Sequence, residues 1–162
     1  LVEATYLDRV AALRPLAQDN DVAVLLDNLP DAVRASGADG VHLTSGIQDF
    51  STAAKQLKPE FITGAGDVRS RHEAMLRGEA GADYLMFGTL DHPATQEELD
   101  LAAWWSETFE IPSALADPVT PISELTAPDC EFIALGDNVW SYPDGPVAAL
   151  KRVEAELGLD AP

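Results

Sequence analysis

Short apolar segments alternate with segments of helical periodicity along the chain, and this alternation limits the fold more than any other feature of the sequence. Six apolar runs of strand length are bounded by Gly, Pro, Asp or Asn. They are residues 22–26, 40–43, 61–63, 84–87, 113–116 and 132–135. Because the runs are almost continuously apolar, they are typical of parallel strands buried on both faces. The alternation therefore predicts repeated β-α units around a parallel sheet.

Seven further segments are predicted to be helices. They are residues 7–18, 29–36, 52–57, 68–79, 96–109, 122–126 and 145–157. Asp67 is a suitable N-cap for the fourth of them, and Gly158 is a suitable stop for the last. In a right-handed β-α series the first helix follows a strand, so we expect at least one strand upstream of Leu1.

The number of strands favours an α/β fold of the (β/α)8 TIM-barrel type, with about six of the eight strands in this chain. Such barrels typically have about 250 residues, and small ones about 200, whereas this chain has 162. We therefore expect residues 1–162 to form a single β/α-barrel domain that lacks roughly the first two strands. If nothing is missing, an open doubly wound sheet is the alternative.

A Gly-Ala-Asp sequence precedes or opens two of the predicted strands, at 37–39 and 81–83, and Pro128-Asp129 opens a third in the same way. Small residues with a carboxylate are suited to the tight turn that leads from a helix into a strand. We interpret these sequences as structural.

The charge balance argues against some classes of partner. The chain has 10 Lys and Arg against 28 Asp and Glu, a net charge of −18. Nucleic acid and anionic membranes are bound by clustered Lys and Arg, so we expect neither as a partner. The composition is that of a globular protein, with 46% hydrophobic residues. A single cysteine, Cys130, cannot form an internal disulfide, which favours a reducing cytoplasm.

The active site is expected where the strands end, because ligands bind at the C-terminal ends of strands in both candidate architectures. Small, carboxylate and amide residues follow the apolar runs there. Gly64, Gly88 and Gly136 come directly after three of the strands. Glycine allows a ligand to approach the backbone and leaves N–H groups free to hold an anion.

Asp27 and Asn28 follow the first predicted strand and offer a pair of hard oxygen ligands. Mg²⁺ prefers one or two carboxylates together with phosphate oxygens of a substrate. The alternative is that Asp-Asn-Leu-Pro forms only a turn and a helix cap.

Other residues that could take part in catalysis or binding have simpler explanations. His42 lies inside a predicted strand, where we expect a structural histidine bonded to neighbouring backbone. His72 and His92 lack the spacing of zinc ligands. Trp104 and Trp105 share one predicted helix, and we expect one of them to pack against the barrel.

Two stretches carry a family resemblance. They are Gly-Ala-Asp-Gly-Val-His-Leu at 37–43 and Gly-Ala-Asp-Tyr-Leu-Met-Phe-Gly at 81–88. With these stretches, and with Asp27-Asn28 at the matching distance, essentially the whole chain resembles thiamine phosphate synthase, within a superfamily that includes thiazole tautomerase. The resemblance implies an eight-stranded barrel that joins hydroxymethylpyrimidine pyrophosphate to thiazole phosphate, releasing pyrophosphate with the help of Mg²⁺. It implies small phosphorylated heterocyclic substrates and allows a homodimer.

The resemblance also implies a set of site residues but no catalytic side chain. Those implied to bind substrate are Asn28, Gly64, Gly66, Gly88, Thr89, Thr95, Gln96 and Gly136, and those implied to bind metal are Asp27 and Asn28. Several family residues are replaced. Residues 44–47 replace Gly-Gln-Glu-Asp and leave Asp49 as the nearest carboxylate, Gln96 replaces a lysine, and Asp117-Pro118 replaces a glycine pair.

Three functions remain open at this point. The first is a thiamine phosphate synthase with altered ligands. The second is a catalytically silent barrel of the same superfamily that binds a small molecule or a partner protein. The third, thiazole tautomerase, is the least favoured, because it requires proton transfer and His92 is the one histidine in a strand-end loop.

Overall fold

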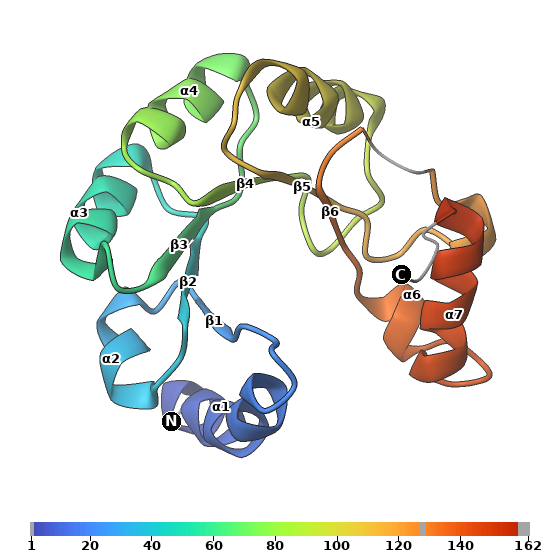
Figure 1. Cartoon of the computed structure of the whole chain (residues 1–162), viewed down its shortest axis with the longest axis horizontal. Helices are drawn as coiled ribbons and strands as arrows, with labels where there is room; N and C mark the ends of the chain where they lie inside the picture. Colours follow the sequence, from blue (N-terminus) through green and yellow to red (C-terminus); the bar gives the residue numbers. More distant parts are fainter. Residues whose placement is uncertain (1, 127–128, 159–162) are drawn as a thin grey trace.

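The computed structural model describes residues 2–126 and 129–158, and over these ranges it contains one sheet of six parallel strands. The strands are β1 (Leu25–Asp27), β2 (Gly40–Leu43), β3 (Ile62–Ala65), β4 (Tyr84–Phe87), β5 (Ser113–Ala116) and β6 (Phe132–Ala134). They pair in the order β1-β2-β3-β4-β5-β6, and the sheet curls along this order (Figure 1). A doubly wound sheet reverses its strand order at a switch point. The sequential order therefore rules out that alternative and confirms a barrel-type α/β fold.

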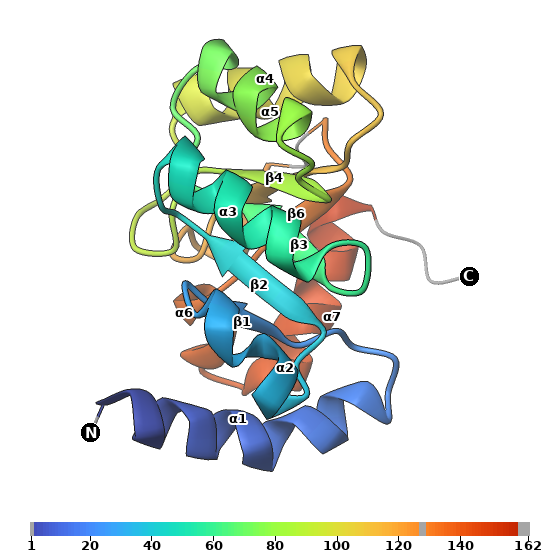
Figure 2. The ribbon, with the colours of Figure 1, turned by 90° about the vertical axis from the view of Figure 1, so that its left-hand side faces the viewer.

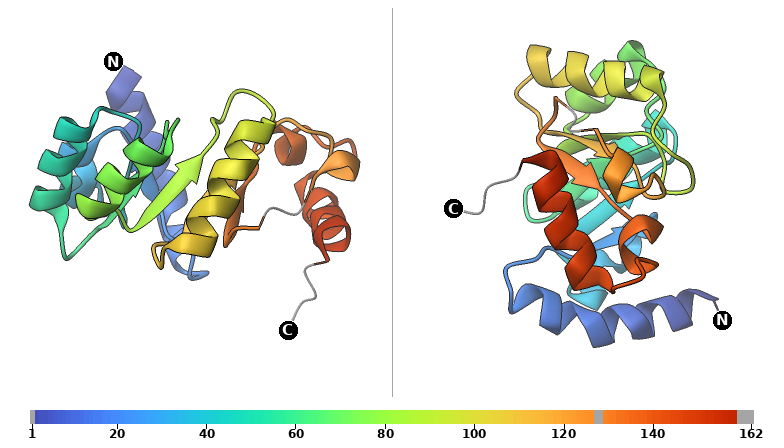
Figure 3. Two further views of the ribbon diagram at one scale, coloured as in Figure 1. Left: turned by 90° about the horizontal axis from the view of Figure 1, so that it is seen from above. Right: turned by 90° about the vertical axis from the view of Figure 1, so that its right-hand side faces the viewer.

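The helices lie outside the curled sheet. They are α1 (Val2–Gln18), α2 (Val33–Ser36), α3 (Ile47–Leu57), α4 (Arg71–Glu79), α5 (Gln96–Thr108), α6 (Asp137–Trp140) and α7 (Pro146–Leu157), with the 3-10 turns η1 (Pro30–Ala32) and η2 (Ile122–Glu124). α2 to α5 follow one another around the sheet (Figure 1), and α1 lies across the end of the molecule next to α2 (Figure 2). α7 lies at the opposite end from α3 (Figure 3). Within the described ranges, no helix is long and apolar enough to cross a membrane.

Five predicted helices have clearly different bounds in the structure, namely those at 7–18, 29–36, 52–57, 68–79 and 122–126. The helices predicted at 7–18 and 52–57 begin earlier, at Val2 and Ile47, the one at 29–36 divides into η1 and α2, and the one at 122–126 is only the turn η2. α4 begins later than predicted because Ser70, not Asp67, is its N-cap. The Ser70 hydroxyl accepts a hydrogen bond from the Glu73 N–H at 3.2 Å. Gly158 ends α7 in the left-handed conformation, as predicted.

The main core lies between the sheet and the helices. Its largest fully buried side chains are Trp105, Phe50 and Phe87. Trp105 is 1% exposed, and its indole N–H donates to the Ile111 carbonyl at 2.7 Å. Burial of each large apolar side chain of this kind stabilises the fold by about 2–3 kcal/mol. Trp104 is half-buried, so one residue of the pair packs fully, as expected.

Three carboxylates close the connections that lead into the even-numbered strands. They are Asp39, which accepts from the Val24 N–H at 2.7 Å, Asp83, which accepts from the Thr63 N–H at 2.7 Å, and Glu131, which accepts from the Ser113 N–H at 2.8 Å. We call them the turn carboxylates. These bonds support a structural role for Gly-Ala-Asp. At the third turn, the carboxylate that makes this bond is Glu131 and not the predicted Asp129, and Pro128 lies outside the described residues.

Candidate active site

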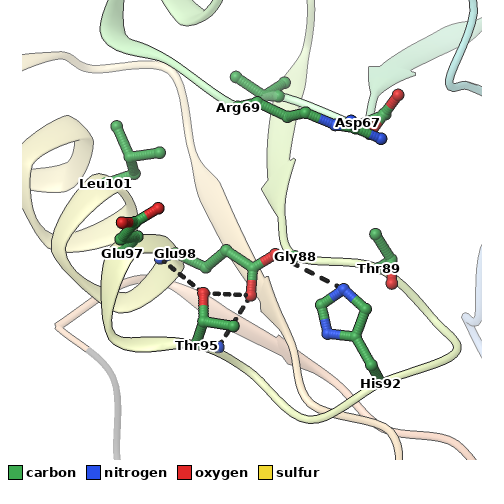
Figure 4. A pocket seen from close by; sticks show the side chains of 10 residues that line it. Asp67, Arg69, Gly88, Thr89, His92, Thr95, Glu97, Glu98 and Leu101 are labelled. Atoms are coloured by element: carbon green, nitrogen blue, oxygen red, sulfur yellow. Dashed lines mark hydrogen bonds and ion pairs between the residues drawn. The ribbon is translucent and has the colours of Figure 1, made fainter.

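Polar side chains gather where β1 to β4 end. A cavity of about 430 Å³, the β1 pocket, is lined by Asp27, Asn28, His42, Thr44, Asp67, Arg69, Met86, Gly88, Thr89, Leu90 and Asp91. A second cavity of about 400 Å³, the α5 pocket, is lined by Asp67, Val68, Arg69, Gly88, Thr89, His92, Thr95, Glu97, Glu98 and Leu101 (Figure 4). Four residues line both, so the two pockets form adjoining parts of one site.

Asp27, Asn28 and Thr44 form one hydrogen-bonded group at the ends of β1 and β2. The Asn28 side-chain amide donates to the Asp27 carboxylate at 2.7 Å and to the Thr44 hydroxyl at 2.9 Å. The Thr44 N–H donates to the Asn28 amide oxygen at 2.9 Å. Asn28 has a φ of 53°, a left-handed conformation that asparagine tolerates better than most residues. The residue before η1 is Leu29, without a side-chain cap, so the helix-cap interpretation of this pair is wrong.

His42 pairs with Tyr84 across the sheet. The His42 Nδ1 lies 2.8 Å from the Tyr84 hydroxyl, and the two rings stack with centroids 5.7 Å apart. The expected bond from His42 to neighbouring backbone is therefore replaced by one to a side chain. Burial lowers the pKa of His42, the Asp27 charge opposes this and the Arg77 charge adds to it. Burial also raises the pKa of Tyr84 to about 12.

Two glycines provide the space for this pair. A Cβ at Gly64 would lie 2.1 Å from Cζ of Tyr84, and a Cβ at Gly66 would lie 2.4 Å from Nε2 of His42. Both distances are far inside van der Waals contact, so any larger residue would displace an aromatic ring. Glycine at these positions is therefore explained by packing inside the protein.

The α5 pocket is bordered by the start of α5 and the segment before it (Figure 4). Thr95 caps α5 in a capping box with Glu98, and the helix begins at Gln96 as predicted. His92 Nδ1 donates to the Pro93 carbonyl at 2.7 Å, and its Nε2 lies 3.9 Å from Glu98. The bond to Pro93 raises the pKa of His92, and the charge of Glu98 adds to this.

The donor set fits a magnesium ion that arrives with a phosphate group better than a metal held by protein alone. Among the residues that the structure describes, no group of three or more His, Cys, Asp or Glu side chains could hold a metal. Asp27 supplies one carboxylate beside the Asn28 amide. Mg²⁺ commonly uses one or two carboxylates and completes its octahedron with waters and phosphate oxygens.

Comparison with known proteins identifies the family. The family model described as thiamine monophosphate synthase matches residues 1–133. The chain belongs to the thiamine monophosphate synthase family. It is 35% identical to the thiamine-phosphate synthase of Rhodospirillum centenum, over 91% of this chain and 75% of that one, and 36% identical to that of Hyphomonas neptunium, over 90% and 69%. The solved thiamine phosphate pyrophosphorylase of Pyrococcus furiosus superposes with a TM-score of 0.72 at 25% identity, covering 94% of this chain and 76% of that one.

Some of the residues implied by resemblance to thiamine phosphate synthase lie together in the structure. Asn28, Gly88, Thr89 and Thr95 line one or both pockets. Gly64 and Gly66 lie beneath Tyr84 and His42. Their roles in binding substrate stay predictions.

Three other positions lie outside the lining of both pockets. Gln96 starts α5 and bonds to Asp100 at 2.8 Å. Gly136 donates its N–H to Asn138 at 3.0 Å. Asp49, the nearest carboxylate to the replaced family residues, is exposed in the first turn of α3.

Sequence reasoning did not assign several residues that line the two pockets, among them His42, Asp67, Arg69 and Asp91. The alternation of side-chain direction along a strand could have indicated that His42 faces the site. Its neighbours Val41 and Leu43 are buried in the core against the helices, so His42 faces the opposite side of the sheet. The other three lie in loops, where the sequence carries no such periodicity.

Proposed function

We propose that this protein is an active thiamine phosphate synthase. It joins hydroxymethylpyrimidine pyrophosphate to thiazole phosphate and releases pyrophosphate, with Mg²⁺ as cofactor. The observation that carries the proposal is the family match over residues 1–133, which includes the two stretches that end at the site. The relatives are named synthases, and the comparisons give no support to a catalytically silent barrel.

The reaction requires the protein to stabilise the charge of the leaving group and to align the two substrates. The bond between the pyrimidine methylene and the pyrophosphate oxygen breaks, the oxygen keeps the electron pair, and the thiazole nitrogen attacks the methylene carbon. Mg²⁺, when bound, neutralises charge on the leaving pyrophosphate. Asp27 and Asn28 are the residues we propose to hold it. Gly88 and Thr89, which line both pockets, are placed where a substrate spanning them would pass.

The negative charge of the lining of the two pockets makes a metal ion important for binding an anionic substrate. Five carboxylates line them, namely Asp27, Asp67, Asp91, Glu97 and Glu98. The basic side chains in this lining are Arg69 and the histidines His42 and His92, and Arg69 is paired with Asp67 at 2.7 Å. A phosphorylated ligand would be repelled by this set unless a cation accompanied it. We therefore propose that the pyrophosphate substrate binds as its magnesium complex.

The decisive experiment is an assay of the full-length protein with both phosphorylated substrates. Thiamine phosphate and pyrophosphate should appear in equal amounts, and only when both substrates and Mg²⁺ are present. Product no higher than in the protein-free control would reject the synthase and leave the silent barrel. Conversion of one thiazole phosphate isomer into another, without the pyrimidine, would indicate a tautomerase.

We also propose a cytoplasmic location, which the composition supports through its single cysteine. A homodimer stays a prediction, and gel filtration with light scattering would test it.

A further inference from the structure

Arg77 is a buried arginine that forms no ion pair with a carboxylate among residues 2–126 and 129–158. It lies on α4 and is 6% exposed. Its Nη2 donates to the Ser45 carbonyl at 2.9 Å, and its guanidinium lies 5.8 Å from the ring of Phe50. Its Nη1 is buried without a hydrogen-bond partner, and so is the Ser45 hydroxyl. Burial of a cation without an ion-pair partner costs free energy and lowers the pKa of Arg77, and the charges of Glu73 and Asp67 oppose this lowering. Packing alone does not explain why an arginine occupies this position.

The bond made by Arg77 leads directly to the candidate metal ligands. Ser45 follows Thr44 in the loop between β2 and α3. Thr44 exchanges hydrogen bonds with Asn28 at 2.9 Å in both directions, and Asn28 donates to Asp27 at 2.7 Å. An unbroken series of contacts therefore joins the outer helix α4 to the Asp27 carboxylate.

Two other arginines lie over aromatic rings and make a useful contrast. Arg34 lies 4.8 Å from the ring of Phe61, and Arg71 lies 4.7 Å from the ring of Trp104. Both arginines are exposed, and Arg34 pairs with Glu60. Arg77 differs from both in being buried and in donating to the loop that carries Thr44.

We propose that Arg77 is a positioning residue, which fixes the Ser45 carbonyl so that Thr44 holds Asn28 and Asp27 in place for a magnesium-bound pyrophosphate. The catalytic consequence rests on the proposed function, whereas the positioning itself does not. Arg77 acts through the loop, because it is 6% exposed and lines neither pocket.

The first test needs no ligand. Amide hydrogen exchange of Thr44 is followed by NMR in the full-length protein and in the variants R77M, R77K and R34M. We expect Thr44 exchange about tenfold faster in R77M, a smaller increase in R77K, and no change in R34M. The Leu85 amide, which donates to the Pro112 carbonyl, should stay unchanged throughout. Unchanged Thr44 exchange in folded R77M overturns the proposal. If R77M does not fold, unchanged exchange in R77K overturns it.

The second test uses Mg²⁺ and inorganic pyrophosphate as the probe, with affinity measured by calorimetry well below the unfolding temperature. R77M should bind about tenfold more weakly than the natural protein, while R34M stays within about twofold. T44V removes the hydroxyl that accepts from Asn28 but keeps the Thr44 N–H bond, so it weakens the series, and the affinity losses of T44V and R77M should be less than additive. Additive losses would overturn the proposal, because they would mean that Arg77 acts independently of Thr44.

The two proposals can fail separately. A natural protein that makes no thiamine phosphate, yet shows the exchange pattern above, counts against the synthase alone. An active protein in which R77M keeps both normal exchange and normal affinity counts against Arg77 alone.

Discussion

Tyr84 and His42 lie across Gly64 and Gly66, so the shape of the site depends on two residues that have no side chain. The rings stack on each other and share a hydrogen bond of 2.8 Å. A substitution at either glycine is therefore expected to displace both rings.

G64A should destabilise the protein by about 1–3 kcal/mol, since the new Cβ would lie 2.1 Å from the Tyr84 ring. Urea unfolding measures the change. G46A is the matched control, because a Cβ there meets nothing within 4 Å, and it should stay within about 0.5 kcal/mol of the natural protein. In a Y84A background the cost of G64A should shrink. A cost that stays the same would show that the ring is not its cause.

D27N should reduce the affinity for magnesium pyrophosphate, and the rate of the proposed reaction, by about 10- to 100-fold. The substitution keeps an oxygen that can accept from Asn28 but removes the charge. D49N is the control, because it makes the same charge change at an exposed carboxylate outside both pockets. Steady-state kinetics with varied Mg²⁺ gives the comparison. Equal rates for D27N and the natural protein would mean that Asp27 only supports Asn28.

Single residues of the site were partly accessible from sequence. Asn28, Gly88 and Thr89 follow strands directly, and position relative to a strand is what sequence periodicity reveals best. The contact between His42 and Tyr84 was not accessible, because it joins β2 to β4 and depends on the register of the strand between them.

Among the elements, the strands were predicted more closely than the helices. The bounds of β2, β4 and β5 agree with the apolar runs, whereas β1 begins at Leu25 and not at residue 22. Val22 is 55% exposed and donates its N–H to the Ala17 carbonyl, so it belongs to the end of the preceding turn. The apolar run begins before β1 does, and only the hydrogen bonds between strands show where β1 starts. α6 has four residues, too few to show helical periodicity.

E131Q tests the turn carboxylates through their dependence on pH. The bond from the Ser113 N–H lowers the pKa of Glu131, and the bond from Ser106 contributes. A carboxyl group whose pKa is lower in the folded protein stabilises it above the usual carboxyl range, and this gain is lost as the pH falls through the lowered pKa. E131Q should therefore lower stability at pH 7 by about 1 kcal/mol, a low value because the side chain is exposed.

The measurement is urea unfolding at neutral and acidic pH. The difference between E131Q and the natural protein should narrow as the solution becomes acidic. E107Q, which neutralises an exposed carboxylate on α5, is the control and should show no such narrowing. A pH-independent difference would assign the effect to shape and not to charge.

For the whole molecule, the net charge of −18 determines whether added salt raises or lowers the KM for an anionic substrate. A negative field slows the approach of an anionic substrate, and salt screens that field. The KM for the pyrophosphate substrate should therefore fall as NaCl rises from about 20 to about 200 mM, with kcat nearly constant. A KM that rises instead would show that Arg69 and His92 outweigh the surrounding carboxylates.

At this scale the sequence was most informative. Alternating apolar runs and helices predict parallel strands joined by right-handed crossovers, and the simplest order of such strands is the sequential one observed. The composition also anticipated the shortage of basic residues in the site.

The turn carboxylates have a consequence for how the molecule is assembled. Their bonds link β1 with β2, β3 with β4 and β5 with β6, so each described link falls within a pair of adjacent β-α units. The turn carboxylates thus group the six strands into three two-strand cassettes, while backbone pairing continues from β2 to β3 and from β4 to β5. A circular permutation that opens the chain between β2 and β3, or between β4 and β5, keeps every cassette whole. A permutation that opens the chain between β3 and β4 separates the two strands of one cassette. These strands then lie at opposite ends of the chain and must pair from there.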